Sequence, residues 1–187
     1  MSKTLGLYVH IPFCRSKCDY CDFYSLAGRE DRMDDYQKAL TAQISEGAPL
    51  ARGYTVNSIY IGGGTPSWYG EKRLCELLRL LQKKFKMAKD IEVTVEANPD
   101  SVTEKALRAV RRAGVNRLSL GMQSACDQEL QDVHRPHTFQ QVVEAVHAAR
   151  KAKIKNLNLD LIYGLPGQTE ESWHNSVEQA IALGPEH

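Results

Sequence analysis

The chain has 187 residues and carries 24 lysines and arginines against 23 aspartates and glutamates, a formal charge of +1. This balance disfavours a nucleic-acid partner, because the basic pairs at 83–84 and 111–112 are typical of solvated helix faces. The sequence contains no run of about 18 apolar residues and no export signal, so we expect neither a membrane-spanning helix nor secretion. The five cysteines are therefore expected as reduced thiols in the cytoplasm.

Apolar, β-rich runs recur along the chain and alternate with amphipathic stretches. They predict strands at residues 7–11, 58–61, 92–95, 117–120 and 157–162. Helical spacing between them is carried by Leu74, Leu77, Leu78, Leu81 and Phe85, and later by Val142, Val143, Val146 and Ala149. Ser101 with Glu104 predicts a capping box for a helix that ends at Gly114. A last helix is predicted from Thr169 to just before Gly184 and Pro185.

This alternation of strands and helices predicts an α/β fold with a parallel sheet of five strands and at least five helices. The sequence stops just after a helix, where the alternation predicts another strand. We therefore expect residues 1–187 to be one domain, the N-terminal part of a longer protein whose C-terminal domain is absent. A short protein with an open sheet edge is the alternative.

The most informative motif is the run C-x-x-x-C-x-x-C formed by Cys14, Cys18 and Cys21. Three thiolates in one loop can hold a [4Fe–4S] cluster and leave its fourth iron open to another molecule. A structural zinc site is the alternative, but such sites usually have four ligands at paired spacings, and only His10 lies nearby. Cys75 and Cys126 fall in helical contexts and are expected to be plain small side chains.

The other candidate residues lie at the ends of predicted strands. Gly62-Gly63-Gly64-Thr65-Pro66 follows the second strand, and Glu96, Gln123 and Asp160 lie at or near the ends of the next three. In parallel βα folds these ends gather at one edge of the sheet, so the residues are expected to meet there. The glycine run allows the backbone to approach a ligand closely, because no Cβ intervenes. It is not a phosphate loop, since the G-x-x-x-x-G-K-[ST] pattern is missing.

The charged residues at these ends have complementary uses. Arg135 suits a carboxylate, and the acidic and amide side chains suit an ammonium group or hydroxyls. Asp160 interrupts an apolar run, where a charge needs a partner.

Together these motifs resemble the oxygen-independent coproporphyrinogen III oxidase family of radical S-adenosylmethionine (SAM) proteins, which includes a haem chaperone branch. The resemblance runs from Tyr8 to His187 and is carried by residues 8–14, the cysteine run, and residues 61–67, 96–99, 121–124, 134–137 and 158–167. It implies an incomplete parallel (β/α) barrel of the radical SAM type, with about five βα units present.

The resemblance also implies a set of site residues. Cys14, Cys18 and Cys21 would ligate the [4Fe–4S] cluster, whose open iron would chelate SAM. One electron, supplied by a donor such as flavodoxin or ferredoxin, would then cleave SAM to methionine and a 5′-deoxyadenosyl radical. The implied SAM contacts are Tyr8, Tyr20, Gly63, Gly64, Thr65, Glu96, Gln123, Arg135 and Asp160.

One position separates the two branches of this family. The oxidases carry an extra cysteine two residues after the third cluster cysteine, where this chain has Phe23. The resemblance therefore favours a haem chaperone, which binds haem, delivers it to haem-accepting proteins and meets membranes only through them. The alternatives are oxidative decarboxylation of coproporphyrinogen III to protoporphyrinogen IX, and a metal-binding structural module without catalysis.

Overall fold

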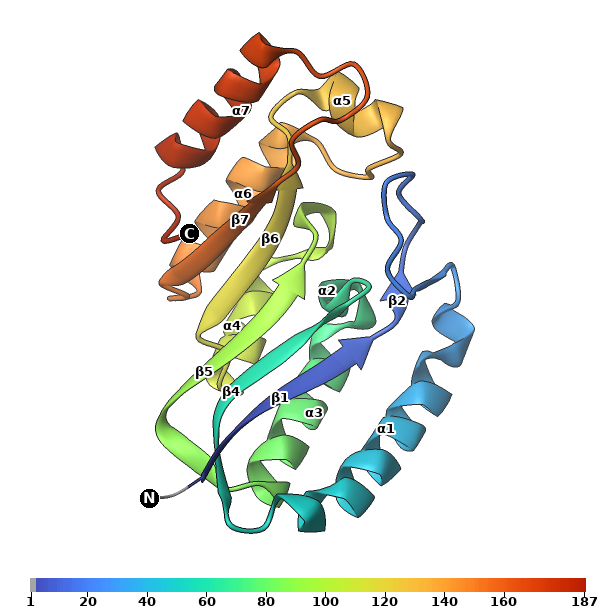
Figure 1. Cartoon of the computed structure of the whole chain (residues 1–187), viewed down its shortest axis with the longest axis vertical. Helices are drawn as coiled ribbons and strands as arrows, with labels where there is room; N and C mark the ends of the chain where they lie inside the picture. The colour runs from blue at the N-terminus through green and yellow to red at the C-terminus, as the bar shows by residue number, and fades with distance from the viewer. Residues whose placement is uncertain (1–2) are drawn as a thin grey trace.

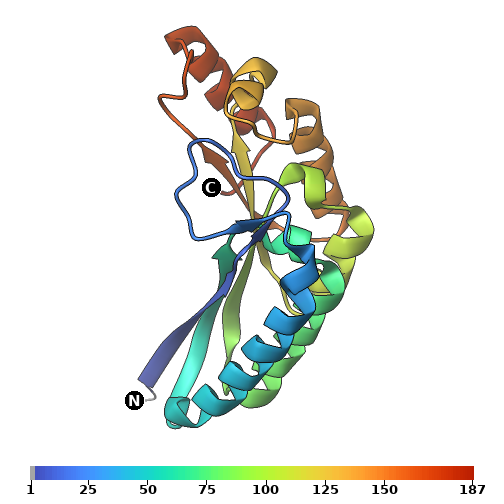
Figure 2. The same ribbon diagram turned by 90° about the vertical axis from the view of Figure 1, so that its right-hand side faces the viewer.

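The computed structural model describes residues 3–187, which form a five-stranded parallel sheet with helices packed on one face (Figures 1 and 2). The strands lie in chain order across the sheet, and every adjacent pair is parallel. They are β1 (Lys3–Ile11), β4 (Tyr54–Gly63), β5 (Met87–Ala97), β6 (Arg117–Gln123) and β7 (Asn156–Leu161). The predicted α/β fold with five parallel strands is therefore confirmed.

Helices connect successive strands and cover the same face of the sheet. The long ones are α1 (Met33–Gly47), α3 (Glu71–Lys84), α4 (Glu104–Arg112), α6 (Phe139–Lys151) and α7 (Glu170–Ala182). Two short helices, α2 (Pro66–Tyr69) and α5 (Asp127–Asp132), follow the ends of β4 and β6. Single 3₁₀ turns occur at η1 (Glu30–Arg32), η2 (Ala48–Ala51) and η3 (Pro99–Ser101).

The two faces of the sheet differ in chemistry because side chains alternate along each strand. Apolar residues that face the helices form the core, for example Ile11, Ile61, Val95, Leu120 and Leu157. The residues between them face the other side and are mostly polar, for example His10, Tyr60, Glu96, Ser119 and Asp160. Parallel sheets usually have both faces covered, whereas the helices within residues 3–187 cover only the apolar face (Figure 2).

The predicted helix starts are partly corrected. Thr169 is the N-cap of α7, as expected, and Gly114 follows the end of α4 with a φ of +117°. The expected Ser101–Glu104 capping box is wrong, because the N-cap of α4 is Thr103, which accepts from the Ala106 amide at 3.1 Å. Ser101 belongs to η3, where its hydroxyl donates to the Asn98 carbonyl at 2.9 Å.

The outer edge of β7 carries further backbone contacts. The Glu186 amide donates to the Leu157 carbonyl at 2.9 Å, and the Leu159 amide donates to the His187 carbonyl at 3.0 Å. These are the contacts that a following parallel strand would make. Across residues 3–187, no helix combines the length and apolar character needed to cross a bilayer.

Candidate functional site

A cleft with a cavity volume of about 120 Å³ lies at the C-terminal edge of the sheet. The loop of residues 15–25, which we call the cysteine loop, forms one wall. All predicted site residues except Tyr8 line it, namely Cys14, Cys18, Tyr20, Cys21, Gly63, Gly64, Thr65, Glu96, Gln123, Arg135 and Asp160. Residues far apart in the sequence are therefore brought together where the parallel sheet predicts.

The base of the cysteine loop is closed by a small second sheet. Strand β2 (Phe13–Cys14) pairs with β3 (Leu26–Ala27), and the Gly28 amide donates to the Cys14 carbonyl at 3.1 Å. Phe13 is buried and stacks on Tyr69 with ring centroids 5.6 Å apart. An aromatic anchor in the core thus fixes the point at which the loop leaves the sheet.

Two side-chain donors point at the cysteine sulfurs. The Thr65 hydroxyl lies 3.4 Å from Cys14 Sγ, and Arg135 Nη1 lies 3.6 Å from Cys18 Sγ. Both sulfurs therefore lie within hydrogen-bonding reach of a neighbouring side chain. All five cysteines are free, and within the described part of the chain no three His, Cys, Asp or Glu side chains are placed to hold one metal ion.

The glycine turn after β4 fits tightly against the start of the cysteine loop. The Gly64 amide donates to the Ile11 carbonyl at 2.8 Å, and the Thr65 amide donates to the Phe13 carbonyl at 2.7 Å. A Cβ at Gly64 would lie 2.8 Å from the Phe13 carbonyl oxygen, a clash with backbone. The glycine therefore allows the end of β4 to lie against the segment that leads to Cys14.

The acidic residues of the cleft are held by neighbours on the polar face. Glu96 accepts from the Tyr60 hydroxyl at 2.7 Å and from the Gly63 amide at 3.0 Å. Burial and the nearby Glu96 raise the pKa of Tyr60 above its usual value, so the phenol stays a donor. Asp160 accepts from the Ser119 hydroxyl at 3.1 Å and from the Asn158 side-chain Nδ2 at 2.6 Å. These contacts provide the partners that we expected for a charge within an apolar run.

Arg135 reaches the cleft from the segment between α5 and α6. Its Nη2 donates to Asn98 Oδ1 at 2.8 Å and to the Gly121 carbonyl at 2.9 Å. Its Nε is buried and has no partner among residues 3–187, which leaves one donor free for a ligand. Gln123, at the end of β6, has a φ of +65°, a conformation that costs energy in residues other than glycine and recurs at binding sites.

The two predicted tyrosines differ in position. Tyr20 lines the cleft, and burial raises its pKa above the usual value, although Arg135 acts in the opposite sense. Tyr8 is 61% exposed and lies beside the cleft, where its hydroxyl contacts His10 Nδ1 at 3.0 Å and its ring stacks on Tyr60. The structure therefore does not place Tyr8 in the cleft lining.

Sequence reasoning missed several lining residues. Asn98 and Ser119 are the most notable, because each hydrogen-bonds to a predicted residue, Arg135 and Asp160 respectively. Ser119 could have been found by the period of two, since it shares a strand face with Gly121. The others are Ser16, Lys17, Phe23, Ser25, Ala97 and Gly121.

Sequence comparison finds relatives along almost the whole chain. The model of the radical SAM superfamily matches residues 8–180. The haem chaperone HemW of Escherichia coli K12 is 40% identical over 184 residues, which cover 98% of this chain and 49% of the relative. HemW of Mycobacterium tuberculosis H37Rv is 37% identical over 188 residues, which cover 99% and 48%. The oxygen-independent coproporphyrinogen III oxidase of E. coli K12 is 34% identical over 185 residues, which cover 98% of this chain and 40% of the oxidase.

Structural comparison agrees with these matches. The E. coli coproporphyrinogen III oxidase HemN, described as a radical SAM enzyme, superposes with a TM-score of 0.92 at 33% identity, covering 99% of this chain and 43% of HemN. Methylornithine synthase PylB, at 15% identity and a TM-score of 0.63, shares the fold alone; the match covers 99% of this chain and 52% of PylB. The chain spans about half the length of the curated HemW relatives it matches.

Proposed function

This chain belongs to the radical SAM superfamily, in the branch that contains HemW and HemN, and we propose that its cleft binds a [4Fe–4S] cluster and SAM. The observation that carries the proposal is the convergence of Cys14, Cys18 and Cys21 with the glycine turn and Arg135 on one cleft. Three thiols suit three irons of a cubane cluster and leave the fourth for a second ligand.

Each side chain then has a role that its chemistry supports. The three cysteines would hold the cluster, and the bound cluster would supply the electron for reductive cleavage of SAM. Arg135 offers its unpartnered Nε to a carboxylate, while Glu96 and Asp160 suit an ammonium group and ribose hydroxyls. Gly63 and Gly64 keep side chains away from the backbone that faces the ligand.

For the whole protein we propose a haem chaperone that binds haem and passes it to haem proteins. The HemW relatives support this proposal, as does Phe23, which lines the cleft where the oxidases are expected to have a further cysteine. The second candidate is oxidative decarboxylation of coproporphyrinogen III, which the likeness to HemN favours. Residues 1–187 would form the radical SAM core domain in either case.

The cellular setting follows from the same chemistry. Five free thiols and an exposed cysteine loop suit a reducing compartment, so we propose a cytoplasmic protein. A flavodoxin or ferredoxin would supply the electron, and haem-accepting proteins would be the downstream partners.

The decisive experiment is anaerobic reconstitution with iron and sulfide, followed by electron paramagnetic resonance of the reduced protein with and without SAM. We expect about four irons and four sulfides per chain and a spectrum that changes when SAM is added. A signal that ignores SAM would contradict the SAM site. A single bound zinc would instead support a structural module.

A second experiment separates the chaperone from the oxidase. The whole protein is incubated anaerobically with coproporphyrinogen III, SAM and a reductant, and in parallel with haem. We expect haem binding without protoporphyrinogen formation. Stoichiometric decarboxylation would overturn the chaperone proposal and leave the cluster assignment intact.

A further inference from the structure

The donors that contact the cysteine sulfurs are fixed by one short segment, residues 98–101, which we call the η3 hub. Asn98 Nδ2 donates to Thr65 Oγ1 at 3.3 Å, and Asn98 Oδ1 accepts from Arg135 Nη2 at 2.8 Å. Thr65 and Arg135 are the donors to Cys14 and Cys18. The hub therefore sets the position of both sulfur donors at once.

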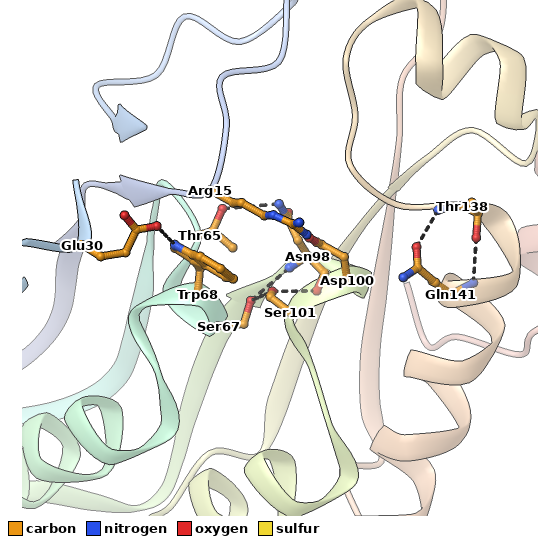
Figure 3. Close-up of polar contacts among 10 residues, drawn as sticks. All are labelled: Arg15, Glu30, Thr65, Ser67, Trp68, Asn98, Asp100, Ser101, Thr138 and Gln141. Atoms are coloured by element: carbon orange, nitrogen blue, oxygen red, sulfur yellow. Dashed lines mark hydrogen bonds and ion pairs between the residues drawn. The ribbon is translucent and has the colours of Figure 1, made fainter. Parts of the chain in front are cut away.

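The hub is itself held in place by a serine pair. The hydroxyls of Ser67 and Ser101 lie 2.5 Å apart, and the Asn98 amide donates to Ser67 Oγ at 3.1 Å (Figure 3). Ser67 belongs to α2, so the end of β5 is tied to the helix that follows the glycine turn. The hub can position the cysteine loop only if the loop is tied to it.

Asp100 supplies that connection. Its side chain is only 4% exposed, and its Oδ2 lies 3.5 Å from Nη1 of Arg15 in the cysteine loop. Its Oδ1 is buried without a partner among residues 3–187. Because a buried carboxylate is costly unless a cation or hydrogen bonds compensate it, Arg15 matters more here than in an ordinary surface pair.

Arg15 follows Cys14 directly and is held by a second contact. Its guanidinium carbon lies 5.9 Å from the centre of the Trp68 ring, a cation–π distance. Trp68 is oriented in turn by Nε1, which donates to Glu30 Oε1 at 3.0 Å. Figure 3 shows the Arg15 side chain extending toward Asp100, so the first residue after Cys14 is tied to the hub.

We propose that Arg15 is a positioning residue, which holds the cysteine loop in register with the η3 hub by pairing with Asp100 above Trp68. This keeps Cys14 and Cys18 beside the Thr65 and Arg135 donors. The inference rests on the proposed function, because positioning these cysteines matters only if they ligate a cluster. The contact of Arg15 with Asp100, which we call the tether, is present in the protein without the cluster.

The first test measures the unloaded protein. Alkylation rates of individual cysteines are followed by mass spectrometry in wild type, Arg15→Gln, Asp100→Asn and the double variant. Loss of the pair should free the cysteine loop and expose the Cys14 and Cys18 sulfurs to the reagent. Arg15→Gln should therefore speed their alkylation by about tenfold, the scale of losing one charged hydrogen bond, and leave Cys126 unchanged. Arg15→Lys, which keeps the charge, should recover most of the protection. Unchanged rates in Arg15→Gln would overturn the proposal.

A matched control and the double variant separate positioning from stability. Arg29→Gln breaks the exposed pair with Asp31 (2.9 Å) just after the loop, and it should behave like wild type. Arg15→Gln should lower the unfolding midpoint, because it leaves the Asp100 carboxylate buried without a cation. In the double variant this buried charge is gone, so the midpoint should return toward that of wild type while Cys14 and Cys18 stay reactive. Recovery of both would mean that Arg15 only neutralises Asp100, and the positioning role would be lost.

The second test uses the reconstituted protein. Arg15→Gln should release iron to a chelator about tenfold faster than wild type and show a weaker spectral response to SAM, because the ligands are less well ordered. A response equal to that of wild type would count against the proposal. Failure of wild type itself to build a SAM-responsive cluster would contradict the proposed function, and the alkylation test of Arg15 would still stand.

Discussion

At the scale of single residues, the three predicted cluster cysteines and Cys75 lie in two different environments. Cys14, Cys18 and Cys21 line the cleft, whereas Cys75 is buried in α3, where burial raises the pKa of its thiol. A raised pKa keeps a thiol protonated and inert. The cysteines in the cleft are therefore placed where they can meet a ligand, whereas Cys75 serves packing in the core.

Single cysteine substitutions test this division. Replacing Cys14, Cys18 or Cys21 with Ala should reduce iron after reconstitution from about four atoms per chain to a small fraction, since the remaining two thiols cannot hold the cluster. Cys75→Ala and Cys126→Ala should keep full loading. Iron and sulfide analysis measures both, and loss of loading in either control would show that the ligands are misassigned.

His137 is a buried histidine next to the site. It is 3% exposed, its Nε2 donates to the Met122 carbonyl at 3.1 Å, and burial with Arg135 nearby lowers its pKa to about 4 from 6.5. The folded protein therefore keeps His137 neutral, while the unfolded chain protonates it below about pH 6.5. Stability from this group is complete above that pH and falls as the pH drops toward 4.

The variant His137→Gln isolates this effect, because Gln can donate to Met122 but does not titrate. Between pH 7 and pH 4, wild type should lose on the order of 3 kcal/mol more unfolding free energy than the variant, since each pKa unit corresponds to about 1.4 kcal/mol. Urea unfolding at several pH values measures the difference. Parallel pH profiles for the two proteins would contradict the assignment.

At the scale of elements, the turn between β4 and α2 couples the strand end to the cysteine loop. In Gly64→Ala, the added methyl would press on the Phe13 and Ile11 carbonyls, which cannot move aside as a side chain can. We expect a loss of about 1–3 kcal/mol in unfolding free energy, the usual cost of overpacking. Gly47→Ala, with open space around its Cβ, is the control and should be neutral or slightly stabilising.

The elements also show how far sequence reasoning reaches. Strand positions and the meeting of Cys14, Glu96 and Gln123 follow from periodicity and from the parallel topology, which are local or general rules. Asn98, Ser119 and the tether of Arg15 to Asp100 were not predicted, because they depend on tertiary contacts between segments up to 85 residues apart. The capping error at Ser101 has the same origin, because the Ser101 hydroxyl pairs with the Ser67 hydroxyl instead of capping α4.

At the scale of the whole molecule, the asymmetric sheet separates packing from binding. Helices cover one face of the sheet (Figure 2), and the cleft lies at the strand ends beside the other, polar face. Adding SAM to the reconstituted protein should therefore slow hydrogen exchange in the cysteine loop and at residues 62–65 and 96–98. Exchange in α1, α3 and α4 should be unchanged, and slowing spread evenly over the helices would contradict the placement.

The open side of the cleft also decides how the protein must be handled. Cys14 and Cys21 are only partly buried, and no helix within residues 3–187 covers the cysteine loop. Dissolved air reaches such a site as easily as a small ligand does, and accessible thiolates are the ones that oxidise. A sample loaded with iron and sulfide under anaerobic conditions is therefore expected to lose its cluster absorbance when it is exposed to air.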